Sequence, residues 1–115
     1  MSRPGIVVSE ELVHDAVDYL VTQSNEAAVA KGNAIRADYH RKRIRAQLIL
    51  RAPHNTHGMR EAWAEAHDDY EEVCKKLATC EEEVERHRNN RSRAEVVCEM
   101  WRTQSASLRG LSRVA

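Results

Sequence analysis

The sequence predicts an all-α protein: a helical hairpin with one long C-terminal helix, which oligomerises through coiled-coil-like packing. Charged residues make up 31% of the 115 positions, and glycine and proline together occupy only six of them. This composition favours helix over sheet. Phenylalanine is absent, so we expect elongated helices that pack through small and aliphatic side chains. At this length we expect a single helical domain over residues 1–115.

The first helix is predicted at about residues 10–22, after an extended or loosely attached stretch at residues 1–8. Ser9 can cap this helix, and acidic residues follow at positions 10 and 11, where the helix dipole favours them. One face of the helix is apolar and carries Leu12, Val13, Ala16, Val17 and Leu20. The polar stretch at 22–25 ends the helix and can cap the next one.

The second helix is predicted at about residues 26–51. Its first half is rich in alanine, which allows a neighbouring helix to approach closely. Ile35, Tyr39, Ala46 and Ile49 are expected to extend this packing stripe at steps of three and four, and Ile44 and Leu48 flank it. Pro53 ends the helix, and residues 53–58 form the clearest turn in the chain because they combine proline, asparagine and glycine.

The third helix is predicted to run without a break from residue 59 to residue 109. Alternating steps of four and three residues from Met59 to Leu108 give fifteen positions, of which twelve are apolar or aromatic. We call these fifteen positions the seam. The polar, arginine-rich stretch at 85–95 lies within the seam and does not change its phase. A loop would have no reason to preserve that phase, so the helix is expected to continue through this stretch.

Charge is strongly segregated along the chain, although the total is balanced. Residues 31–51 carry seven Lys or Arg and one acid, whereas residues 59–87 carry four Lys or Arg and ten acids. The second helix, about 40 Å long, can therefore fold back over the acidic half of the third helix, which is about 75 Å long. The other half has no partner within the chain unless the first helix reaches it.

Self-association is expected here, because an apolar stripe that stays exposed to water is unfavourable. The predicted interface between copies consists of seam residues in the second half of the long helix: Ala94, Cys98, Trp101 and Leu108.

Basic residues on the second helix and after residue 87 form a candidate surface for single-stranded DNA, with Tyr39 and His40 as the nearby side chains that could stack on bases. The residues expected to contact phosphates are Arg36, Arg41, Lys42, Arg43, Arg45, Arg88, Arg91 and Arg93. The alternative is that these charges only neutralise the acidic helix, and the sequence leaves both interpretations open.

Other functional classes find little support in the sequence. No glycine-rich phosphate loop, nucleophile motif or paired carboxylates are present, so no enzyme is expected. Cys74 and Cys80 are six residues apart and point to different helix faces, so neither a metal nor another cofactor is expected. No apolar run approaches the ~18 residues that span a membrane. Three cysteines without a signal peptide are typical of a reducing cytoplasm.

Two stretches carry a family resemblance, "MREAWAEAHDDYEEVCKKL" at 59–77 and "EVVCEMWRTQSASLRG" at 95–110. With the alanine-rich helix before them, they resemble small phage-encoded all-helical proteins, some of which are similar to UvsY-like recombination mediators. The resemblance implies an oligomeric accessory protein of phage DNA recombination or replication, acting in the host cytoplasm. Such a protein would bind single-stranded DNA and a RecA-like recombinase or another replication partner. The alternative is a protein-interaction module without nucleic-acid binding, such as a host-takeover or defence-blocking factor.

Overall fold

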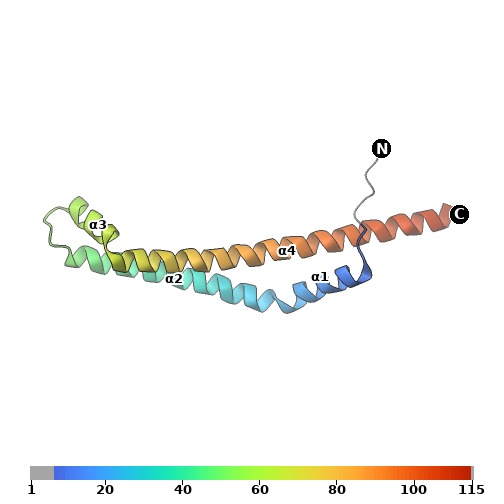
Figure 1. Ribbon diagram of the computed structural model, residues 1–115, viewed down its shortest axis with the longest axis horizontal. Coiled ribbons are helices and arrows are strands. Elements are labelled where there is room, and N and C mark those ends of the chain that lie inside the picture. The colour runs from blue at the N-terminus through green and yellow to red at the C-terminus, as the bar shows by residue number, and fades with distance from the viewer. Residues whose placement is uncertain (1–6, 115) are drawn as a thin grey trace. The chain divides into compact units, whose positions relative to one another are not determined.

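The computed structural model describes residues 7–114, and the side chains of residues 7–111. The helices of this part of the chain are α1 (Glu10–Thr22), α2 (Ser24–Arg51), α3 (His57–Ala66) and α4 (Asp68–Val114), drawn in Figure 1. Residues 7–114 contain no strand, which confirms the all-α prediction. None of the helices described is both long enough and apolar enough to cross a membrane.

The first two helices begin and end close to the predicted positions. The Ser9 hydroxyl accepts a hydrogen bond from the backbone N–H of Leu12 at 3.1 Å, which confirms Ser9 as the cap of α1. Gln23 alone separates α1 from α2, and its N–H donates to the carbonyl of Tyr19 at 2.9 Å. α2 ends at Arg51, as the proline at position 53 predicts.

α4 passes through residues 85–95 as one uninterrupted helix, and Figure 1 shows no break there. The prediction of continuity is therefore confirmed for this stretch. The prediction of a single helix from residue 59 is wrong, because the chain leaves the helical conformation at His67, with φ −73° and ψ 142°.

His67 ends α3 and also caps α4. Its imidazole Nδ1 accepts a hydrogen bond from the backbone N–H of Asp69 at 3.1 Å. Three acids, Asp68, Asp69 and Glu71, lie in the first turn of α4, where they stabilise a helix N-terminus. A local acceptor followed by acidic residues therefore makes a new helix start favourable at this point.

The described residues belong to two compact units, which are considered separately. Residues 26–86 form one unit, in which α2 packs antiparallel to the first part of α4. The Arg41 side chain reaches Tyr70, while Ala37, earlier in α2, lies across a groove from Cys80, later in α4. The predicted hairpin between the basic helix and the acidic segment is thus present.

The face of α2 that packs agrees only in part with the predicted one. One stripe of buried and half-buried residues has steps of four and three: Ala30, Ala34, Ala37, Arg41, Ile44 and Leu48. The alanines, Ile44 and Leu48 are expected there, but Ile35, Tyr39 and Ala46 are exposed and Ile49 is half-buried. The packed stripe has three alanines in its first half, and small side chains let two helix axes approach more closely than Ile or Tyr would.

The other unit takes in residues 7–25 and 87–114. The side-chain amide of Gln104 holds Val8 by two hydrogen bonds, accepting from the Val8 N–H at 2.9 Å and donating to its carbonyl at 3.0 Å. Val8 is buried, so the prediction of loose attachment is wrong at this residue, while residues 1–6 of that stretch lie outside the described residues.

α1 supplies an intrachain partner for the second half of the long helix, since both lie in this unit. Ala94 is buried within the single chain, and Cys98 and Trp101 are half-buried. Leu108, the last residue of the predicted interface, remains exposed. Three of the four predicted interface residues are therefore at least half-buried without a second copy.

Candidate nucleic-acid interface

Two of the predicted DNA-binding cations on α2 are held by one carboxylate of the same helix. Asp38 accepts from Arg41 at 2.9 Å and forms an ion pair with Lys42 at 3.2 Å. Hydrogen bonds from Arg41 and then Lys42 hold the pKa of the Asp38 carboxyl below its usual value, so it stays ionised at neutral pH. Arg41 also donates to the Tyr70 hydroxyl at 3.2 Å, which turns its guanidinium toward α4.

A third cation, Arg45, connects α2 to α3. Its guanidinium lies 3.0 Å from a carboxylate oxygen of Glu65 and 3.6 Å from one of Glu61. Both acids lie in the acidic segment 59–87, which the alternative interpretation expects to neutralise the basic helix. For Arg45, and in part for Arg41, the structure favours a role in holding the hairpin together.

The other two α2 cations that are predicted to bind DNA have no carboxylate partner among the described residues. Arg36 donates to the side-chain oxygen of Asn33 at 2.7 Å, and its residue is exposed. Arg43 is also exposed, and within residues 7–111 it forms neither an ion pair nor a side-chain hydrogen bond. Steps of three and four place both arginines on one side of the helix with Tyr39 and His40. We call these four residues the outer face of α2, and two of them at its edge, Arg36 and His40, also line a groove beside α4.

Tyr39 is the aromatic residue of this face, and its 68% exposure leaves most of the ring open to solvent. The one acid of residues 31–51 is Asp38, which is already engaged by two cations. The outer face therefore combines two cations, an imidazole and an accessible aromatic ring, with no other carboxylate between residues 31 and 51 to neutralise it.

The predicted cations after residue 87 belong to the other unit and form a separate group. Arg91 pairs with Glu95 one turn later at 3.1 Å. Arg93 is exposed and has no ion pair or side-chain hydrogen bond within the described part of α4. Arg88 is exposed as well.

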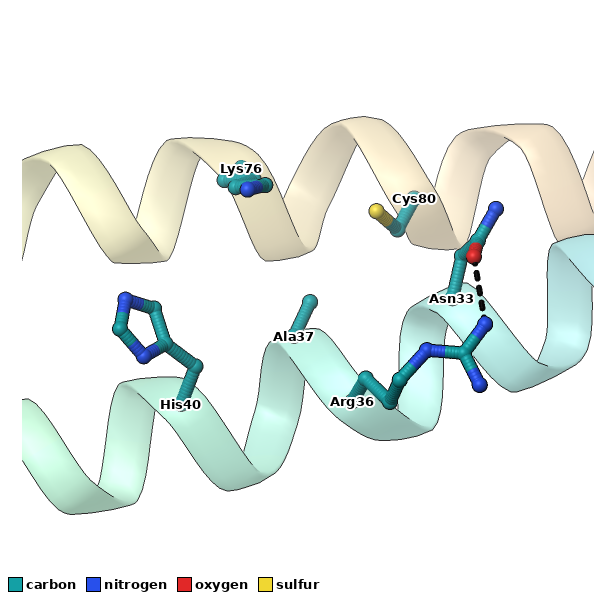
Figure 2. A pocket seen from close by; sticks show the side chains of 6 residues that line it. All are labelled: Asn33, Arg36, Ala37, His40, Lys76 and Cys80. Carbon is teal, nitrogen blue, oxygen red and sulfur yellow. Dashed lines mark hydrogen bonds between the residues drawn. The ribbon is translucent and has the colours of Figure 1, made fainter.

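A groove of about 490 Å³ lies between α2 and α4 in the unit of residues 26–86, beside the outer face of α2. Figure 2 shows the residues that line it, namely Asn33, Arg36, Ala37, His40, Lys76 and Cys80. Sequence reasoning missed Lys76 because it lies in a strongly acidic segment. The antiparallel register, which faces Ala37 with Cys80, brings Lys76 to the same groove as His40.

Among the described residues, no three His, Cys, Asp or Glu side chains are placed to hold a metal ion. The chain gives no match to a protein-family model, to a curated protein or to a solved structure.

Proposed function

We propose that this protein is a non-catalytic accessory factor of phage DNA recombination or replication that binds single-stranded DNA through the outer face of α2. The observation that carries the proposal is the exposed Tyr39 ring between Arg36 and Arg43, neither of which has a carboxylate partner among the described residues. Single-stranded nucleic acids are bound by such a combination of cations for phosphates and an aromatic ring for base stacking. The resemblance to phage-encoded helical proteins supplies the biological setting, the host cytoplasm.

The proposal changes the set of residues expected to contact DNA. Arg41, Lys42 and Arg45 are held by Asp38, Glu61 and Glu65. If these cations left their carboxylates to contact a phosphate, the loss of the ion pairs would offset part of the binding energy. Arg36, Arg43 and the exposed Arg93 remain able to meet phosphates without losing an ion pair.

Two double variants on the same helix test this proposal. Arg36→Ala with Arg43→Ala removes two phosphate contacts, so the slope of log affinity against log salt should flatten by about 1.4, at ~0.7 per phosphate on single strands. Affinity should fall, while the melting temperature stays near that of wild type because both residues are exposed. Fluorescence anisotropy with a labelled oligonucleotide at several salt concentrations measures both quantities.

Arg41→Ala with Arg45→Ala is the matched control, because it removes the same charge from the same helix. It should leave affinity and salt slope unchanged and destabilise the protein by about 1 kcal/mol, since these side chains pair internally. Absence of binding by wild type at low salt would refute the proposal. Loss of affinity in the control variant alone would place the DNA on a different face.

A second candidate function is a protein-interaction module that does not bind nucleic acid. Ile35 and Leu50 of α2 are exposed, and three of the five cations predicted to bind DNA on this helix are already paired. Exposed apolar residues with basic residues beside them could contact an acidic amphipathic helix of a partner such as a RecA-like recombinase. Capture of one such partner by wild type, without DNA affinity at low salt, would favour this function.

Self-association through the C-terminal part of α4 is a further part of the proposal. Leu108 and Leu111, three residues apart, are exposed there and lie on one side of the helix. We expect Leu108→Glu to give a smaller species in sedimentation at tens of micromolar while helicity is kept. Val96→Glu, at an exposed residue outside the seam, should leave the wild-type species unchanged. A wild-type protein that is monomeric at this concentration would refute self-association.

A further inference from the structure

We propose that the groove between α2 and α4 is a binding site for a phosphate group. Its six lining residues include two basic side chains, Arg36 and Lys76, and none of the six is acidic. The volume of about 490 Å³ is within the range of sites that hold small ligands. The site shares Arg36 and His40 with the outer face of α2 but draws its second basic side chain from a different helix.

Both helices contribute side chains to the groove, as Figure 2 shows. From α2, the His40 ring and the Ala37 methyl group point toward α4, while Lys76 and Cys80 stand on α4 itself. An imidazole keeps at least one N–H donor in either protonation state, and an ammonium group carries three. Lys76 and His40 can therefore donate to one anion from opposite sides of the groove.

Arg36 is held in place on the α2 side. Its Nη2 donates to Asn33 Oδ1 at 2.7 Å, and its guanidinium lies close over Gly32, where an added Cβ would sit 3.4 Å from Nη2. In Figure 2 the amide nitrogen of Asn33 is turned away from Arg36, so it can serve as a further donor. A guanidinium held by one hydrogen bond keeps its other N–H groups for a phosphate, and it loses less rotamer entropy on binding.

Lys76 lines the groove, whereas the neighbouring Lys75 does not, so comparing the two tests the role of the groove. Lys75 pairs with Glu71 at 3.1 Å and does not line the groove. Lys76 lines the groove and forms no ion pair within the side chains that the structure describes. The two lysines have the same charge on the same helix, so Lys75 provides a matched control for the general electrostatic effect.

Sodium pyrophosphate, exchanged for sodium chloride at constant ionic strength, is the direct probe. We expect saturable NMR shifts at the Asn33 side-chain amide, the His40 ring and the Ala37 amide of the wild-type protein. Lys76→Gln and Arg36→Gln should each weaken this binding by about tenfold or more, as loss of a charge-assisted hydrogen bond would. Lys75→Gln should bind pyrophosphate as wild type does. Shifts that fail to saturate, or that are the same in Lys76→Gln, would overturn the inference.

The phosphate could belong to the backbone of a bound DNA strand or to a free nucleotide. A labelled oligonucleotide distinguishes these two sources. If Lys76→Gln lowers oligonucleotide affinity and flattens the salt slope by about 0.7, the groove holds a phosphodiester of the bound strand. If Lys76→Gln loses pyrophosphate but keeps oligonucleotide affinity, the groove holds the phosphate of a free nucleotide. Both results support the site. Saturable pyrophosphate binding in a protein without DNA affinity would refute the proposed function and leave this inference standing.

Discussion

Leu48→Ala is expected to lower the free energy of unfolding by about 2–5 kcal/mol, through lost apolar burial and the cavity that remains. Leu48 is 1% exposed and ends the packed stripe of α2, which contains few other large side chains. For a unit of this size the melting temperature should fall by at least about 10 °C. Thermal unfolding followed by circular dichroism measures the change.

Leu50→Ala is the control for this prediction, because it makes the same chemical change two residues later on the same helix. Leu50 is 77% exposed, so its truncation should change stability by less than about 0.5 kcal/mol. Equal effects of the two substitutions would mean that Leu48 is no more buried than Leu50. A larger effect at Leu50 would show that α2 packs through a different face.

Val8→Asp is expected to detach the start of the chain and α1 from α4. Val8 is 1% exposed, and an uncompensated buried charge costs about 3–5 kcal/mol. The amides of α1 should then exchange with solvent at least about 100-fold faster, since each 1.4 kcal/mol corresponds to a factor of ten. Amides of residues 26–66 should keep their protection because they belong to the other unit.

Val7→Asp is the matched control, at the neighbouring residue and with the same change in charge. Val7 is 79% exposed, so hydrogen exchange in α1 should stay at the wild-type rate. If Val8→Asp also left exchange in α1 unchanged, the two hydrogen bonds with Gln104 would not hold this segment in solution.

The helix content and most helix ends could be predicted from the sequence because they depend on local chemistry. Each signal acts within a few residues of its position: Ser9 caps α1, Pro53 follows the end of α2, and the seam keeps its phase across residues 85–95. The break at His67 is also local, but its signal is weak. Met59, Trp63 and Ala66 keep the seam phase although α3 ends there, so periodicity alone cannot reveal a one-residue interruption.

The packing face of α2 could not be predicted from apolar periodicity alone, because this helix carries two stripes with the same spacing. One contains Ile35 and Tyr39, and the other contains Ala30, Ala37 and Arg41. Larger apolar side chains made the first stripe look like the core. The second one packs because its small residues fit a close helix neighbour and because Arg41 finds Tyr70 across the interface.

The candidate site was only partly accessible from sequence for a related reason. A run of basic residues shows that cations are present but not which of them will meet a carboxylate. Glu61 and Glu65 engage Arg45 from α3, a separate helix whose end at Ala66 the sequence does not predict. Lys76 lines the groove because of the register of α2 against α4. That register depends on contacts between distant parts of the chain, so local sequence does not reveal it.

The pairing of Val8 with Gln104 has a consequence for the order of folding. The two residues are 96 positions apart, whereas α2, α3 and the start of α4 contact one another across much shorter loops. Contacts that close long loops form late, since the entropy of closure has to be overcome first. On the ribosome, Val8 leaves the exit tunnel long before Gln104 is made. The apolar face of α1 therefore stays uncovered until this part of α4 has been made, and a chaperone could bind the nascent chain in that interval.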